Sequence, residues 1–239
     1  MTTVLVGCFD PVEFPTTPFV EFESIEYNEV DGPDSLVLSF RFEDGDSDIG
    51  LGNDLVDLLK PYQIYNFIID SNDNAITISD DEAVPPFFSA PVLLDQIDGV
   101  PVYRFFIDLK DPFSDVDNRP PYDCENYEII GDDTVYVSRN EFHHNFHVEF
   151  LERQTSGEFT ALDFQSIFNS DDCNLGNFNG RIPIFDSNGK EGLITYTMLS
   201  QAFRLAFQDD SIKIRFWVYD RALNKSNVVE SPAFLLRDL

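Results

Sequence analysis

The sequence has few basic residues. Fifteen lysines and arginines stand against 44 aspartates and glutamates in 239 residues, which gives a formal net charge of −29 at pH 7. Proteins that bind DNA or RNA obtain most of their affinity from basic side chains on phosphates, and anionic lipid surfaces attract basic patches for the same reason. The composition therefore excludes ordinary nucleic-acid binding and electrostatic attachment to a membrane.

Long apolar runs and catalytic signatures are also missing. The sequence contains no stretch of about 18 apolar residues, the length that crosses a bilayer as a helix. It has no Gly-x-Ser-x-Gly or His-Glu-x-x-His motif and no Gly-rich phosphate-binding loop. We therefore expect no transmembrane helix and no enzyme activity, with a glycosidase-like carboxylate pair among the 44 acidic residues as the alternative.

Apolar side chains are abundant and follow a strand-like pattern. Hydrophobic residues make up 43% of the chain and aromatic residues 14%, too much apolar surface for a disordered polymer. The only weak helix patterns lie at 54–60 and 159–168, and 200–207 fits a helical turn or a strand. Apolar alternation and turn signals predict strands at 19–27, 35–42, 65–70, 102–107, 142–151, 181–185, 192–198, 211–219 and 228–236. Many short strands predict an all-β protein, an antiparallel β-sandwich.

The first residues resemble a bacterial lipoprotein signal. Leu5, Val6, Gly7 and Cys8 match the lipobox, in which the cysteine receives the lipid. Only seven residues precede Cys8 and none is basic, so we expect a truncated signal. Residues 1–18 would then be signal and acidic, Pro-rich tether, and the alternative is a coincidental cysteine.

The other two cysteines lie in polar, turn-like surroundings. If Cys8 carries a lipid, Cys124 and Cys173 remain as an even pair in an exported chain, which predicts a disulfide. It would close a loop of roughly 50 residues and contribute about 4 kcal/mol. Two unpaired thiols are the alternative.

An acidic loop follows the predicted strand at 35–42. Asp44, Asp46 and Asp48 alternate with small residues around Gly45 and Gly50. Carboxylates in this spacing suit Ca²⁺, which takes six to eight oxygen ligands. The sequence therefore predicts a structural Ca²⁺ site at these three residues, and no other cofactor is expected; the alternative is an acidic turn whose side chains cap backbone N–H groups.

Two other polar segments favour structural roles. His143, His144 and His147 fall in a predicted strand, where four residues span about 13 Å, too far for His143 and His147 to share a zinc ion. We expect a core-facing His144 and two surface imidazoles. Residues 220–227 predict a hairpin turn held by Asp, Asn and Ser side chains.

Three groups of segments carry a family resemblance. They are residues 38–51, LSFRFEDGDSDIGL; residues 117–124, DNRPPYDC, with FHHN at 142–145; and residues 178–183, FNGRIP, with YDRALNKSNVV at 219–229. In order and spacing the chain resembles a group of uncharacterised Bacteroidota outer-membrane lipoproteins built on an immunoglobulin-like sandwich.

The resemblance implies a domain organisation and a cellular location. It implies one immunoglobulin-like sandwich over 19–239 with a long insertion at 54–139; two tandem sandwiches are the alternative. It also implies a lipid anchor in the outer membrane, and acidic Asp10 and Glu13 after Cys8 resemble surface-export signals, which favours the cell surface over the periplasm.

The function we expect is binding rather than catalysis. The resemblance suggests an accessory protein-binding subunit of an outer-membrane complex for uptake, secretion or barrel assembly, whose partners are a barrel or other lipoproteins. A glycan-binding surface lipoprotein is the alternative, followed by a hydrolase. Candidate partner-contacting aromatics in the insertion are Phe87, Phe88, Phe113 and Tyr122; the alternative is that the insertion covers the sandwich core with these rings.

Overall fold

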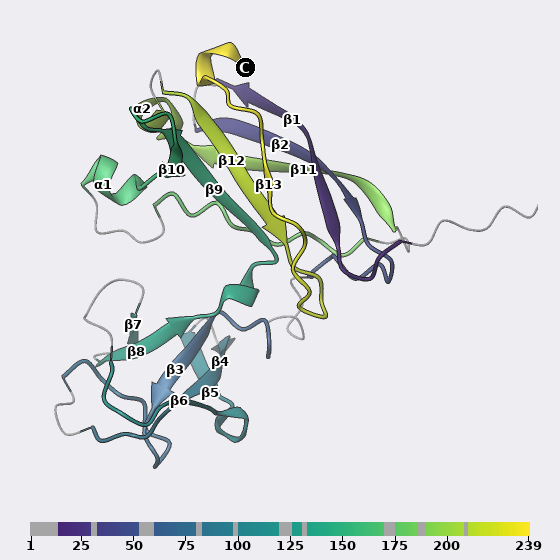
Figure 1. Cartoon of the computed structure of the whole chain (residues 1–239). Coiled ribbons are helices and arrows are strands. Elements are labelled where there is room, and N and C mark those ends of the chain that lie inside the picture. Colours follow the sequence, from purple (N-terminus) through teal and green to yellow (C-terminus); the bar gives the residue numbers. More distant parts are fainter. Residues whose placement is uncertain are drawn as a thin grey trace, which may run out of the picture.

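The computed structural model confirms an all-β sandwich. It describes residues 14–29, 33–52, 60–79, 83–97, 100–119, 126–130, 133–169, 175–185, 190–207 and 210–239. Strands account for 46% of the chain and helices for 10%. Two antiparallel sheets face each other around one core, and a third sheet lies beyond one end of them (Figure 1).

The first sheet has three strands with β2 in the middle. β2 (Asp34–Glu43) pairs with β1 (Phe19–Asn28) on one side and with β11 (Glu191–Ser200) on the other. The side chains of β2 that point into the core are the four that the alternation in the sequence places on one face of the strand. They are Leu36, Leu38, Phe40 and Phe42, all buried.

The second sheet has four strands. β9 (Phe146–Arg153) and β12 (Ile212–Val218) are central, and β10 (Phe159–Ala161) and β13 (Val229–Glu230) lie at the edges. The inward face of β12 is fully buried, as its alternation predicts. Its members are Ile212, Ile214, Phe216 and Val218.

The chain passes between the two sheets three times: from β2 to β9, from β10 to β11, and from β11 to β12. Such crossings are the Greek-key connections of immunoglobulin-like sandwiches. In this molecule the fourth sandwich strand, β10, pairs with the third, β9, rather than with the fifth.

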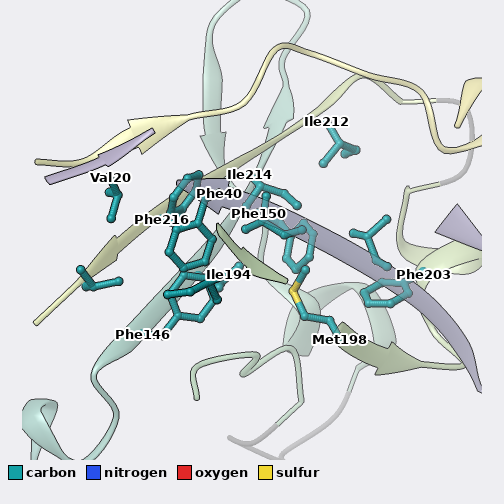
Figure 2. Packing of buried hydrophobic residues seen from close by; sticks show 14 of the residues in the cluster. Val20, Phe40, Phe146, Phe150, Ile194, Met198, Phe203, Ile212, Ile214 and Phe216 are labelled. Carbon is teal, nitrogen blue, oxygen red and sulfur yellow. The ribbon is translucent and has the colours of Figure 1, made fainter. Parts of the chain in front are cut away.

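Phenylalanine rings fill the core (Figure 2). At its centre the ring of Phe40 stacks on that of Phe146, with 5.1 Å between the ring centroids. The centroid of the Phe216 ring lies 5.2 Å from that of Phe40. At one end, α1 (Phe164–Phe168) and α2 (Phe203–Phe207) each begin and end with phenylalanine. Phe150 of β9 lies 5.0 Å from Phe207, so the short helices close this end with aromatic contacts.

The third sheet is built from residues that lie between β2 and β9 in the chain. Its strand order is β5-β4-β3-β8-β7, and β6 also pairs with β4. One face buries Phe67 and Ile69, and the other buries Ile68 and Tyr136. The bounds are β3 (Tyr65–Ile69), β4 (Phe87–Ile97), β5 (Val100–Phe105), β6 (Asp111–Ser114), β7 (Tyr127–Ile130) and β8 (Asp133–Arg139), with the 3₁₀ turn η2 (Ile107–Leu109) before β6. We call these residues the inserted sheet.

The last predicted strand is much shorter than 228–236. Only Val229–Glu230 forms a strand, and the 3₁₀ turn η4 (Leu236–Asp238) follows. Ser231 explains the interruption: its hydroxyl accepts a hydrogen bond from the N–H of Ile214 at 2.9 Å, in place of a backbone partner. Pro232 has no N–H to continue the ladder.

The predicted strand at 181–185 is absent. Gly180 forms an isolated bridge to Phe146, and the chain then runs on without a strand partner. The N–H of Ile182 donates instead to the side chain of Asn145 at 2.8 Å. Pro183 interrupts any ladder at this point.

A side chain just before β13 joins β1 of the opposite sheet. The amide of Asn227 accepts from the N–H of Val20 at 2.8 Å and donates to the carbonyl oxygen of Val20 at 2.9 Å. These two residues lie 207 positions apart in the sequence. The Asn227 amide thus takes the place of a neighbouring strand at the edge of β1.

Candidate functional site

The acidic loop begins where β2 leaves its sheet. The N–H of Asp44 donates to the carbonyl oxygen of Lys190 at 2.7 Å, which ties the start of the loop to the strand beside it. Ser47 has a left-handed backbone with φ of 66°, so the chain folds back on itself. The N–H groups of Asp48 and Ile49 consequently donate to Oδ2 of Asp44 at 2.7 and 2.9 Å.

The glycines of this loop are required by close packing. A side chain at Gly45 would collide with the backbone oxygens of Phe14 and Pro15, and the N–H of Gly45 donates to Pro15 at 2.7 Å. A side chain at Gly50 would lie 2.7 Å from the carbonyl oxygen of Pro183. Neighbouring segments therefore cover the loop on two sides, and Asp44 is buried beneath them.

Asp44, Asp46 and Asp48 come together as the sequence predicts. One oxygen from each lies within 4.8 Å of the others, and among the described residues this is the only such group of three or more acidic, histidine or cysteine side chains. Asp44 is fully buried, Asp48 half-buried and Asp46 exposed. Oδ1 of Asp44 and Oδ1 of Asp48 are buried and accept no hydrogen bond from the described part of the chain.

Burial and mutual repulsion disfavour the charged carboxylates. Burial, followed by the neighbouring Asp46, raises the pKa of Asp44 to about 7. Burial, followed by the charges of Asp220 and Asp46, raises the pKa of Asp48 to about 6. The carboxyl groups of the loop therefore disfavour one another's charged form, and two of their buried oxygens accept no hydrogen bond from the described residues.

Asp220 is a further acidic residue at this place. It lies in the turn after β12, is 1% exposed, and caps that turn by accepting from the N–H and side-chain amide of Asn224 at 2.7 and 2.8 Å. This confirms the turn at 220–227. The N–H of Arg221 donates to the carbonyl oxygen of Asp48 at 3.1 Å, so the turn and the acidic loop are directly bonded.

The link from Asp220 to the loop is not visible in local sequence. The loop after β2 and the turn after β12 meet at one end of the sandwich only once the strand order is known. An immunoglobulin-like order brings the loops after the second and sixth strands together at one end. A correct strand order would therefore have predicted that Asp220 lies beside the acidic loop.

Asn145 is a second residue that the sequence analysis missed. Its side chain is 2% exposed and joins three segments at the same end of the sandwich. Its Nδ2 donates to the carbonyl oxygens of Ile49 at 2.6 Å and Tyr219 at 3.3 Å, and its Oδ1 accepts from Ile182. The end of the acidic loop therefore depends on one amide.

The junction with the inserted sheet lies beside these contacts. The hydroxyl of Tyr62, just before β3, donates to the carbonyl oxygen of Arg221. The carbonyl oxygen of Tyr62 lies 3.0 Å from Nδ1 of His143, in the 3₁₀ turn η3 (Glu141–His143) that leads into β9. A chain of bonds thus runs from Asp48 through Arg221 to Tyr62 and the start of the inserted sheet.

The expectation for the histidines is wrong in its register. β9 begins at Phe146, so His143 and His144 precede the strand, and His147 rather than His144 is the buried imidazole. His147 stacks on Trp217 at 5.1 Å, and the Lys225 ammonium lies 4.2 Å from the Trp217 ring. The side chain of Asn140 accepts a hydrogen bond from the N–H of Phe142 and caps η3, so the strand begins only after this turn.

The three imidazoles are held in their neutral form. Burial lowers the pKa of all three, and for His144 the neighbouring His143 and His147 lower it further, to about 4. His144 and His147 line a polar pocket of about 420 Å³ beside β8, together with Arg139 and Asn179. Neutral imidazoles in such a place serve as packing and hydrogen-bonding groups.

We expect His144 to make stability depend on pH. Its pKa in the fold lies below the ordinary value of 6.5, so the unfolded chain binds the proton more tightly and stability falls as pH drops from 6.5 toward 4. Between pH 7 and 4.5 the wild type should lose about 2 kcal/mol more than His144→Asn. Urea unfolding at both pH values measures this difference, and equal losses would contradict it.

The aromatic candidates have different environments. Phe87 is fully buried against Ile68 and Tyr136, so it offers no partner contact: β4 turns it into the inserted sheet. Phe88 is half-buried under the Lys110 ammonium, 4.6 Å from its ring, and Phe113 is half-buried at one end of the sheet. Tyr122, Cys8, Cys124 and Cys173 lie outside the described residues.

Comparisons with known proteins give no relative. No protein-family model, curated protein or solved structure matches the chain. Within the described residues, no helix has the length and apolar character needed to span a membrane.

Proposed function

We propose that the protein is a non-catalytic, lipid-anchored outer-membrane protein that acts as an accessory, protein-binding subunit of a larger envelope complex for uptake, secretion or barrel assembly. The proposal attaches the lipid to Cys8 and places the folded body at the cell surface. The lipobox-like start and the sandwich fold support it.

The inserted sheet is the observation that carries the proposal. It extends from the end of the sandwich where the acidic loop and the turn after β12 meet (Figure 1). A rigid sandwich that presents an added element from one loop end is a common design for binding proteins. The inserted sheet thus offers a surface distinct from the sandwich.

One end of this sheet has the composition of a protein contact. Phe87 of β4 lies opposite Ser114 of β6, so the residues before β4 and after β6 emerge together. Val84 is 71% exposed and Val116 is 61% exposed there. Residues 86–87 and 112–115, which include Phe113, line a pocket of about 320 Å³ at this end. Exposed apolar side chains and a pocket at the same end of a sheet favour burial by a partner.

The test is affinity capture from the native envelope. The full-length tagged protein, extracted in mild detergent, should bring down a barrel or other lipoproteins in stoichiometric amounts, as identified by mass spectrometry. Capture of the tagged protein alone, in amounts sufficient to see a partner, would overturn the proposal.

A pair of matched variants locates the contact. Val84→Asp/Val116→Asp should reduce partner recovery about tenfold, because charges at a contact centre are costly to desolvate. Leu193→Asp/Leu199→Asp places the same charges at comparably exposed positions on β11 and should leave recovery unchanged. Equal recovery with both variants would rule out this end of the inserted sheet.

A further inference from the structure

We infer that Asp44, Asp46 and Asp48 form a binding site for a divalent cation of the Ca²⁺ class, and that the ion holds the acidic loop against the turn after β12 at the junction with the inserted sheet.

The first argument is the unpaired buried oxygen of Asp44. This side chain has no solvent exposure, and its Oδ1 accepts no hydrogen bond from the residues that the structure describes, while its Oδ2 accepts two from the loop backbone. A buried carboxylate oxygen without a donor is costly. The two backbone N–H groups reach only Oδ2, and a cation bound to Oδ1 compensates the charge of this second oxygen.

The second argument is that the oxygens converge. Oδ1 of Asp48 is also buried without a donor, and oxygens of all three aspartates lie within 4.8 Å of one another. Two oxygens bound to one Ca²⁺ at 2.3–2.6 Å are separated by less than about 5 Å. The exposed Asp46 leaves one side of the site open, where water completes the six to eight oxygens of Ca²⁺.

The third argument is the surrounding charge. Asp220 adds a buried carboxylate beside Asp48, although both of its oxygens already accept from Asn224. It increases the attraction for a cation without serving as a direct ligand. Loop glycines keep the backbones of 14–15 and 183 close, which excludes water from the covered side.

The position of the site gives the ion a structural role. The N–H of Arg221 donates to Asp48, and the hydroxyl of Tyr62 donates to Arg221. An ion that fixes Asp48 therefore also fixes the turn after β12 and the entry to the inserted sheet. This inference does not depend on which partner the protein binds.

The experiment is a cation titration of the chelator-treated full-length protein at pH 7.5. Calorimetry should show one Ca²⁺ per chain, with weaker binding of Mg²⁺. At about one hundred times the dissociation constant, Ca²⁺ should raise the melting temperature by about 5 to 10 °C. Hydrogen exchange at the Asp48, Ile49 and Arg221 amides should slow when Ca²⁺ is added.

Asp46→Asn and Asp108→Asn separate a site from general attraction to an acidic protein. Both residues are exposed, so both variants should fold, and each removes one negative charge. Asp46→Asn should weaken Ca²⁺ binding at least about tenfold, and Asp108→Asn should leave it within about twofold. Absence of binding at 10 mM Ca²⁺ (about ten times the weakest dissociation constant of extracellular modules, roughly 1 mM), or equal effects of the two variants, would overturn the inference.

Discussion

Replacing Phe40 with alanine is expected to lower the free energy of unfolding by about 4 kcal/mol. Phe40 is fully buried at the centre of β2, and its ring contacts Phe146 and Phe216 of the opposite sheet at 5.1 and 5.2 Å. Removal of the ring leaves a cavity between two sheets whose strand ladders prevent collapse. Thermal unfolding should show a melting temperature lower by about 10 °C.

Leu193→Ala is the matched control for Phe40→Ala. Leu193 lies on β11 of the same sheet, opposite Arg41, but it is 53% exposed. Its truncation should change the free energy of unfolding by less than about 0.5 kcal/mol. Similar losses in the two variants would mean that the centre of the sandwich is not packed as described.

Replacing Asn145 with alanine is expected to cost about 3 kcal/mol, because it leaves three backbone groups without a partner. The carbonyl oxygens of Ile49 and Tyr219 lose their donor, and the N–H of Ile182 loses its acceptor. Two of these bonds are buried, so water does not replace them at low cost. Urea unfolding at pH 7 measures the loss.

Asn177→Ala serves as the control for Asn145→Ala. The Asn177 side chain is exposed and accepts from the nearby N–H of Asn179 at 3.1 Å. We expect a loss below about 0.5 kcal/mol for this variant. If Asn145→Ala were equally mild, the end of the acidic loop would be held by other contacts.

The sandwich strands were predictable where one face is buried. In β2 and β12 every second residue is apolar and every second residue faces the core, so period-two alternation was sufficient. The alternation also predicted which side chains are buried. Pairing of β2 with β11 was not readable, since no local pattern relates two strands so far apart in sequence.

The inserted sheet was harder to predict. β4 (Phe87–Ile97) lacks clear alternation and contains Pro91, so its composition favours a loop rather than a strand. In the fold β4 pairs with β3, β5 and β6, and these tertiary contacts override the local preference. Buried Phe87 follows from the same pairing.

The candidate site was predictable only in part. Asp44, Asp46 and Asp48 are neighbours in sequence, so local spacing brought them together. The contributions of Asp220, Asn145 and Tyr62 arise from three other segments, and only the strand order unites them. The prediction of which histidine faces the core was wrong because a capped 3₁₀ turn takes the place of the first residues of the predicted strand.

The bond between Val20 and Asn227 has a consequence for the order of folding. The inserted sheet pairs only residues between 65 and 139, so its contacts form as soon as that stretch has been synthesised. The sandwich needs partners from both sides of it, and Asn227 joins β1 across 207 positions. Contacts that close such long loops form slowly. We therefore expect two kinetic phases, in which the inserted sheet folds early and the edge of β1 is closed last.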